Sequence, residues 1–392
     1  MSDLFRQSVT GTPQPPPSSS RPRPHPLAIS ESDDHDSSDS SASSSADSTA
    51  SINTVRPSSR EQSAPETHWT RYFAQELWLE QKREEHWAKY HVYLTPPTDA
   101  RKGPLFICHH GAGASGLSYA VFAQDVRKRL PEAGVLSLEA RAHGSMVTNK
   151  PGNDDGEGEE ILDFSLPTLT ADALAMITLT QQKMGWSTLP PSVLVGHSLG
   201  GAIATQLAMD FALGSSLIGF CVIDVVEGSA IEALQHMKTY LSSRPSMFGS
   251  VDEAITWHTR TRTIRDAESA KASVPSLLVQ LPSGKYVWRT DLNATSPWWE
   301  EWFKGMSRKF LAGRGAKLLI LAGTDRLDRE LMIGQMQGKF QLVVVPEAGH
   351  FVQEDVPDKT AQLLVEFFKR NDRSAMVMPP KVSEMLAKGM KV

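Results

Sequence analysis

Short apolar runs alternate with longer amphipathic stretches through the middle of the chain. The apolar runs cover residues 91–94, 105–108, 135–138, 193–195, 218–226, 317–321 and 342–345. The amphipathic stretches have helical spacing and cover residues 117–130, 168–184, 199–213 and 358–370. Runs that are apolar throughout, rather than at every second position, predict strands buried on both faces. The alternation of such strands with helices predicts a mostly parallel, doubly wound α/β sheet.

The pattern changes at both ends of the chain and at one place inside it. Residues 1–65 are rich in Ser, Pro and Asp. They bury too little apolar surface to offset the entropy of ordering, so we expect a disordered tail. Residues 66–371 then form the globular domain, and residues 372–392 form a second tail. Within the domain, residues 227–315 have mostly helical patterns, which predicts a cap inserted over the carboxyl ends of the strands.

Composition and charge exclude several classes of protein. The chain has 392 residues, a formal net charge of −5 and 2 cysteines. No basic excess points to nucleic acid, and no apolar run reaches the ~18 residues of a membrane helix. Cys108 and Cys221 lie in apolar runs, which predicts buried, reduced thiols. We therefore expect a soluble intracellular protein of the cytoplasm and nucleus, with neither nucleic acid nor a membrane as partner.

The first candidate for chemistry follows the predicted strand at residues 193–195. Residues 196–200 match the pattern G-x-S-x-G and lead into a predicted helix. This strand–turn–helix setting is typical of the nucleophile turn in the α/β-hydrolase fold, and it makes Ser198 the candidate nucleophile. Glycines are needed because side chains at the flanking positions would collide with neighbouring backbone. The positive end of the helix also favours an oxyanion at this place.

An oxyanion hole requires two backbone N–H donors. One is expected from Leu199, directly after the nucleophile, and the other from the Gly-rich loop after residues 105–108. Ala112 is the preferred second donor, with Gly111 as the alternative. His110 is interpreted as a residue that braces this loop. The chemistry of such a site needs no metal and no organic cofactor.

The general base should follow the last strand, and His350 does so after residues 342–345. His143 precedes the nucleophile in the chain and is interpreted as a second loop-bracing histidine. Two aspartates fit the order serine, acid, histidine. Asp224 ends an apolar run, and Asp325 follows the next strand, where many hydrolases of this fold carry the acid. The pattern alone slightly favours Asp325 and leaves both open.

Several longer runs resemble the protein phosphatase 2A methylesterase family of the α/β-hydrolase superfamily. They are GHSLGGAIA at residues 196–204, IDVVEG at 223–228 and IGQMQGKFQ at 333–341, and the resemblance spans residues 68–370. It implies a serine carboxylesterase that removes the methyl ester from the C-terminal leucine of the phosphatase 2A catalytic subunit. It also implies Asp224 as the acid of the triad, because the family's aspartate lies in the second run.

The same resemblance requires a groove for a polypeptide tail. Trp298 and Met336, with their apolar neighbours, could line it, and the alternative is that they pack in the core of the cap. The chain departs from animal members of the family in a short cap loop, residues 280–285, and in its long N-terminal tail. Two other functions remain open: a general esterase of small molecules, and a phosphatase-binding inhibitor in which catalysis is secondary.

Overall fold

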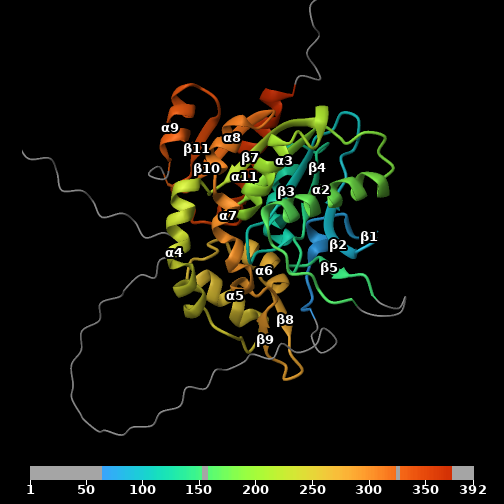
Figure 1. Ribbon diagram of the computed structural model, residues 1–392, viewed down its shortest axis with the longest axis vertical. Coiled ribbons are helices and arrows are strands. Elements are labelled where there is room, and N and C mark those ends of the chain that lie inside the picture. The colour runs from blue at the N-terminus through green and yellow to red at the C-terminus, as the bar shows by residue number, and fades with distance from the viewer. Residues whose placement is uncertain (1–63, 152–157, 324–326, 373–392) are drawn as a thin grey trace, which may run out of the picture.

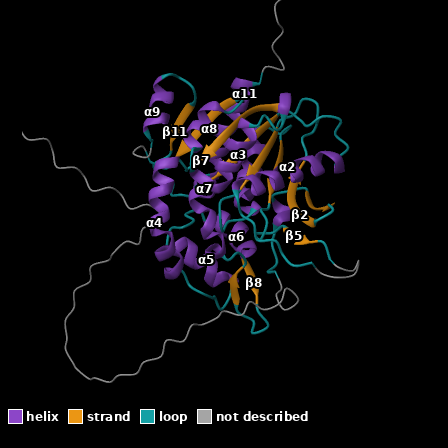
Figure 2. Cartoon of the chain, viewed as in Figure 1, coloured by secondary structure: helices purple, strands orange, loops and turns teal. Residues whose placement is uncertain are grey.

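The computed structural model of this protein describes residues 64–151, 158–323 and 327–372. The two predicted tails therefore lie outside the described residues, except for residues 64–65 and 372. A nine-stranded sheet crosses the molecule, with helices on both of its faces (Figure 1, Figure 2). The strands are β1 Gln75–Lys82, β2 His86–Thr95, β3 Leu105–His109, β4 Gly134–Leu138, β5 Met146–Asn149, β6 Ser192–His197, β7 Leu217–Ile223, β10 Ala316–Leu321 and β11 Gln341–Val344.

The order of the strands is β1-β2-β4-β3-β6-β7-β10-β11, and β5 pairs with β2. All pairs from β4 to β11 along this order are parallel, whereas β1, β2 and β5 pair in antiparallel fashion. The predicted α/β-hydrolase fold class is confirmed. Because β3, β6 and β7 are parallel, their carboxyl ends lie on the same edge of the sheet. From β3 the chain continues first to β4 on one side and then to β6 on the other. Open α/β sheets place their binding sites outside the carboxyl ends at such a reversal.

Each face of the sheet has its own hydrophobic core. α2 (Leu166–Lys183), α3 (Leu199–Met209) and α8 (Met306–Ala312) cover one face, and α1 (Ala120–Arg129) and α11 (Pro357–Asn371) cover the other. Along β7, Phe220 and Val222 pack into the first core, while Cys221 and Ile223 pack into the second. This burial on both sides explains the uninterrupted apolar runs. The prediction of free, buried cysteines is confirmed for Cys108 and Cys221.

One predicted strand was too long, and two strands of the large sheet, β1 and β5, were missed, as was the small hairpin at residues 278–288, in the region predicted as a cap. The run at residues 218–226 is a strand only to Ile223, because Asp224 turns the chain with φ 51° and Val226 caps the next helix. β1 and β5 escaped prediction because they flank β2 at one side of the sheet, where many of their side chains meet water and are polar or charged. Burial on one face only weakens the apolar signal.

The region predicted as a cap lies between β7 and β10. It contains α4 (Glu227–Ser243), α5 (Val251–Arg260), α6 (Ala267–Ser273), the hairpin β8 (Leu278–Gln280) with β9 (Tyr286–Trp288), and α7 (Trp299–Phe303), before α8. In Figure 1 α5, α6 and the hairpin lie below the sheet, and α4 runs along the left of the molecule. A small separate core around Phe248, Ala254 and Ile264 holds part of this region together. Two short helices complete the chain, α9 (Arg329–Met336) and α10 (Val352–Asp355). None of the helices within the described residues is both long and apolar enough to span a bilayer.

Candidate active site

Ser198 lies on a sharp turn between β6 and α3. Its backbone has φ 51° and ψ −118°, a conformation that residues other than glycine rarely adopt. The N–H of Ser198 donates to the carbonyl of Ile223 at 3.1 Å, which ties the turn to the end of β7. The predicted nucleophile therefore stands on a strained turn that the neighbouring strand holds in place.

Glycines on both sides make this turn possible. A Cβ atom on Gly196 would lie 2.1 Å from the carbonyl oxygen of Gly200. A Cβ atom on Gly200 would lie 2.1 Å from the carbonyl oxygen of His109, at the end of β3. Both distances are far below contact, and the obstacles are backbone atoms that cannot swing aside. The steric reason inferred from the sequence is thus visible in the fold.

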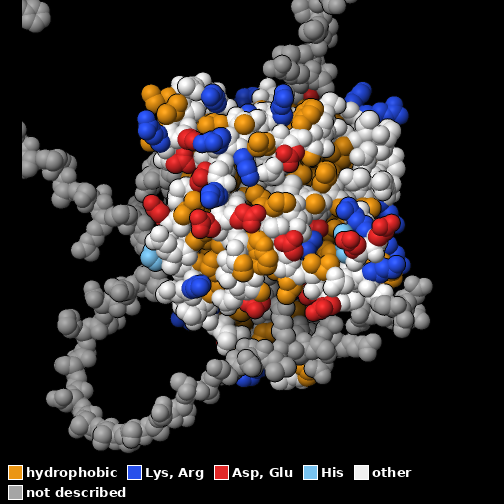
Figure 3. Space-filling model, viewed as in Figure 1, with side chains coloured by type: hydrophobic (Ala, Val, Ile, Leu, Met, Phe, Trp, Pro, Cys, Tyr) orange, Lys and Arg blue, Asp and Glu red, His pale blue; other side chains and the backbone are white. Residues whose placement is uncertain are grey.

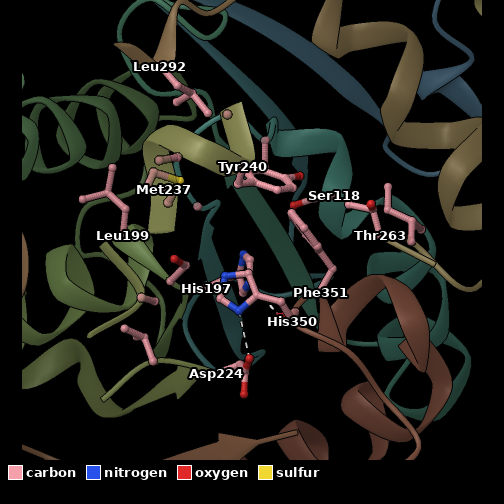
Figure 4. A pocket seen from close by; sticks show the side chains of 18 of the residues that line it. Ser118, His197, Leu199, Asp224, Met237, Tyr240, Thr263, Leu292, His350 and Phe351 are labelled. Atoms are coloured by element: carbon pink, nitrogen blue, oxygen red, sulfur yellow. Dashed lines mark hydrogen bonds and ion pairs between the residues drawn. The ribbon is translucent and has the colours of Figure 1, made fainter. Parts of the chain in front are cut away.

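His350 and Asp224 meet at the carboxyl edge of the sheet. His350 lies in the loop between β11 and α10, and Asp224 follows β7 directly. Nδ1 of His350 is 2.8 Å from Oδ2 of Asp224 (Figure 4). The other oxygen, Oδ1, accepts a hydrogen bond from the N–H of Ala322 at 2.8 Å. Asp224 is buried and His350 half-buried. Asp325, the other predicted acid, lies outside the described residues.

Two buried histidines hold the loop that follows β3. Nδ1–H of His110 donates to the carbonyl of Gly111 at 2.8 Å, and its Nε2 accepts from the N–H of Ala140 at 3.0 Å. Nε2 of His143 accepts from the N–H of Gly113 at 2.9 Å. Burial lowers the pKa of His143 to about 4 and holds the pKa of His110 well below its usual range, so both rings stay neutral. Both histidines hydrogen-bond to backbone groups of the loop, which agrees with their interpretation as residues that brace it.

Two backbone N–H groups near Ser198 are unused within the described residues, one in the loop after β3 and one at the start of α3. The N–H groups of Gly113 and Ala114 are used within the protein, by His143 and by the carbonyl of Gly111. In the part of the chain that the structure describes, the N–H groups of Ala112 and Leu199 donate to no protein atom. A Cβ on Gly111 would lie 3.0 Å from Cβ of Ser198, so the loop approaches the serine closely. Two free donors flanking a serine can stabilise an oxyanion.

A single pocket collects these groups. Ser198, Leu199, Gly111, Ala112, Asp224 and His350 all line it. It is a narrow space of about 120 Å³ between the sheet edge and the cap. Figure 4 shows Leu199 and Met237 on one side, Ser118 and Thr263 on the other, and Tyr240 between them. Indole and phenyl rings of Trp299, Trp302 and Phe303 extend the apolar side.

The sequence of this chain is similar to those of known proteins over most of its length. It matches the Alpha/beta hydrolase family over residues 106–363. Protein phosphatase methylesterase 1 of Aspergillus oryzae is 57% identical over 333 residues, which are 84% of this chain and 77% of that protein. The proteins of the same name from Neurospora crassa and Schizosaccharomyces pombe are 50% and 45% identical, over 88% and 80% of this chain and 87% of each of those proteins.

The chain belongs to the protein phosphatase methylesterase 1 family.

Solved structures agree on the fold. E-2-(Acetamidomethylene)succinate hydrolase superposes with a TM-score of 0.56 at 16% identity, covering 75% of this chain and 100% of that chain. The peroxisomal alpha-beta-hydrolase Lpx1 of Saccharomyces cerevisiae gives 0.55 at 14% identity, covering 80% and 94%. At such identities the likeness concerns the fold alone. The family itself makes this methylesterase a carboxylic ester hydrolase.

The structure does not bring every predicted site residue into the methylesterase pocket. Trp298 packs against Phe164, with ring centroids 5.6 Å apart, and is not among the pocket residues. Met336 is 85% exposed at the end of α9, outside the pocket. For Trp298 the alternative of packing in the core fits the contacts, whereas Met336 lies on the surface.

Sequence reasoning missed the contact made by His197. This residue precedes Ser198 and is buried. Its Nε2–H donates to the backbone carbonyl of His350 at 2.9 Å, which ties the loop carrying His350 to the turn carrying Ser198. Burial, with the nearby His350, lowers the pKa of His197 to about 3. The variable position in G-x-S-x-G gives no signal for such a contact.

The described residues contain no group of three or more His, Cys, Asp or Glu side chains that could hold a metal ion. Several ionisable groups of the methylesterase pocket have pKa values that are shifted by burial and by neighbouring side chains. One of them, Glu354, is buried beside the pocket and accepts a hydrogen bond from Ser273. Burial, with the charge of Asp355, raises the pKa of Glu354 from 4.5 to about 8. Burial raises the pKa of Glu139, under the loop after β3, to about 8 as well.

These two carboxyls predict a loss of stability as the solution becomes alkaline. Between pH 6.5 and 8 Glu354 and Glu139 keep protons in the fold that they have released in the unfolded chain, so these two groups lower the free energy of unfolding as pH rises. Each group contributes about 2 kcal/mol over this window. The Glu354→Gln variant cannot ionise here, and over this window its free energy of unfolding, measured in urea, should fall by about 2 kcal/mol less than that of the wild type.

The buried histidines are neutral in the fold throughout this window, because burial lowers their pKa values. In the unfolded chain they still release protons just above pH 6.5, which raises the free energy of unfolding with pH. This contribution is the same in the wild type and in Glu354→Gln, and it cancels in the difference between them. Glu347→Gln is the matched control. This glutamate is exposed and pairs with Lys359, which lowers its pKa, so it is ionised throughout. An unchanged slope in Glu354→Gln would show that Glu354 is ionised in the fold.

Proposed function

We propose that this methylesterase hydrolyses the methyl ester on the C-terminal leucine of the catalytic subunit of protein phosphatase 2A, with Ser198, His350 and Asp224 as the catalytic triad. The observation that carries the proposal is the contact of 2.8 Å between His350 and Asp224 beside the strained turn of Ser198, in a chain of this family. The apolar side of the pocket, with Leu199 and Met237, suits a leucine side chain.

The chemistry is acyl transfer in two steps. Nε2 of His350 takes the proton of the Ser198 hydroxyl as its oxygen attacks the ester carbonyl. The N–H groups of Leu199 and Ala112 stabilise the resulting oxyanion, and Asp224 stabilises the imidazolium. His350 then gives its proton to the leaving methoxide, which departs as methanol. Water, deprotonated by His350, attacks the acyl-serine, and the leucine leaves with a free carboxylate while Ser198 recovers its proton.

α9 supplies a surface on which the phosphatase could be recognised. Met332, Ile333 and Met336 are exposed on it, at the upper left of Figure 3, where hydrophobic side chains lie beside basic ones. A Cβ atom added to Gly228, in the first turn of α4, would lie 3.6 Å from Cβ of Asp328, the N-cap residue of α9. The first turn of α4 therefore lies close to the start of α9. The surface of α9 is thus continuous with the helix that lines the pocket, which suits a partner that feeds its tail inward.

The test compares methanol release from carboxymethylated phosphatase 2A with hydrolysis of a small acyl ester. The wild type should act on both. Met336→Asp should lower kcat/KM on the phosphatase by about 10-fold or more and leave the small ester unaffected, because a charge would be buried in the interface. Met209→Asp is the control, since this methionine is 44% exposed on α3.

Two outcomes would contradict the proposal. A wild type that cleaves the small ester but releases no methanol from the phosphatase would be a general esterase. A wild type that releases none but binds and suppresses the phosphatase would be an inhibitor with secondary catalysis. Equal loss of both activities in Met336→Asp would indicate misfolding rather than a contact surface.

A further inference from the structure

Arg244 is a cation in the methylesterase pocket that forms no ion pair with any residue the structure describes. It ends α4 and lines the same cavity as Ser198. Its Nε is buried and lacks a hydrogen-bond acceptor. Among the residues that the structure describes, the guanidinium forms neither an ion pair nor a hydrogen bond. Arg244 is half-buried, and leaving its buried Nε without an acceptor is costly, so a ligand that supplies acceptors would be favoured there.

The groups around Arg244 leave room for such a ligand. Its Cζ lies 4.4 Å from the ring centroid of Trp288, a cation–π contact that uses none of the guanidinium's N–H donors in a hydrogen bond to a carboxylate or carbonyl oxygen. His258 lies nearby, and its Nδ1–H donates to the carbonyl of Ala254 at 2.8 Å. Burial lowers the pKa of His258 to about 4, and the charge of Arg244 adds to this. Tyr240 and Thr263 bring hydroxyl groups to the same part of the pocket (Figure 4).

One face of α4 lines the pocket from Arg244 to the end that contains Ser198. The pocket residues of α4 are Ser229, Ala230, Ala233, Leu234, Met237 and Tyr240, followed by Arg244. They recur every three or four residues, singly or as adjacent pairs, which puts them on one helix face. At ~1.5 Å per residue, Ala230 and Arg244 lie ~21 Å apart along the axis. An extended peptide advances ~3.3 Å per residue, so no more than about six residues separate the two ends.

We propose that Arg244 binds an acidic side chain of the substrate peptide, within about six residues before the methyl-esterified leucine. This inference rests on the proposed function, since it needs a peptide ester as substrate. A carboxylate matches the planar fork of arginine and restores the missing acceptors. The apolar face of α4 between the two ends carries the intervening residues.

A peptide of that length requires a wider passage than the narrow pocket offers. α4 can provide it at low cost, because Leu241 is its one fully buried residue among the described ones. Leu234, Met237 and Tyr240 pack against the core but are only partly buried, so a small outward movement exposes little fully buried surface. The acidic residue then stabilises the widened form by pairing with Arg244.

The experiment uses the full chain and octapeptides that end in leucine methyl ester. A single Glu is scanned from the second to the sixth residue before the leucine, and each peptide is paired with its Gln counterpart. The measured quantity is the ratio of kcat/KM for the Glu peptide to that for the Gln peptide, taken within each variant. The wild type should prefer Glu at one position by about 10- to 100-fold.

Arg244→Gln should bring that ratio close to one, and Arg244→Lys should keep part of it because the charge remains. Arg260→Gln is the matched control, an exposed arginine at the end of α5 that does not line the pocket, and it should keep the full ratio. In the wild type the preference for Glu should appear at one position of the scan and fall at the neighbouring positions, since α4 fixes the distance between Arg244 and the catalytic end.

A wild type that hydrolyses all peptides without preference would overturn this inference and leave the proposed function intact. A ratio that survives in Arg244→Gln would also overturn it. If inorganic phosphate inhibits the wild type but not Arg244→Gln, and no Glu preference exists, Arg244 binds free anions instead of a substrate side chain. Failure to hydrolyse any leucine methyl ester, with a small acyl ester still cleaved, would remove the proposed function and this inference together.

Discussion

Replacing Ser198 by alanine is expected to lower methanol release from methylated phosphatase 2A by roughly 10⁵- to 10⁶-fold, because the attacking oxygen is lost. That corresponds to about 7–8 kcal/mol of transition-state stabilisation. Ser198 occupies a strained turn, φ 51°, that depends on its flanking glycines and on the bond from its N–H to Ile223. None of these needs the hydroxyl, so the variant should fold and still bind the phosphatase.

Ser216→Ala is the matched control for this loss. The hydroxyl of Ser216 donates to the carbonyl of Leu189 at 2.8 Å, far from the pocket, and activity should be retained. Methanol release and thermal unfolding are measured for both variants. Substantial release by a correctly folded Ser198→Ala would mean that another group is the nucleophile.

Asp224→Asn is expected to lower kcat by about 10⁴-fold with little loss of stability. The two oxygens of Asp224 have different partners: Oδ1 accepts from the N–H of Ala322, and Oδ2 faces Nδ1 of His350. An asparagine can keep its oxygen on Ala322, and its NH₂ group would then face His350. The ring would shift to the tautomer that carries its proton on Nε2, where it can no longer accept the proton of Ser198.

Asp325→Asn discriminates between the two aspartates that the sequence offered. It should keep most of the activity, because Asp224 would still orient the imidazole. Initial rates on a leucine methyl ester, with circular dichroism as a check of folding, decide the matter. Near-total loss in Asp325→Asn with a functional Asp224→Asn would reverse the assignment of the acid.

Local sequence was sufficient for the scaffold of the site. Continuous apolar runs predicted the buried strands because both faces of the sheet are covered, and the chain order of Ser198 and His350 followed from strand ends. The glycines around Ser198 could be interpreted without a structure, since their role is a short-range steric one. The same local reasoning overran β7, because nothing in the apolar run announces the positive φ of Asp224.

Contacts between distant segments were decided by the tertiary structure alone. The sequence placed two aspartates before His350, and only the fold puts the carboxylate of Asp224 at 2.8 Å from its ring. The bond from His197 to the carbonyl of His350 joins segments 153 residues apart and has no local signal. Arg244 looks like an ordinary helix-ending arginine until the cap folds back and encloses it with Ser198. Periodicity and steric limits act over a few residues, whereas the direction in which α4 crosses the sheet edge depends on the packing of the whole cap, and this packing decided which polar groups meet.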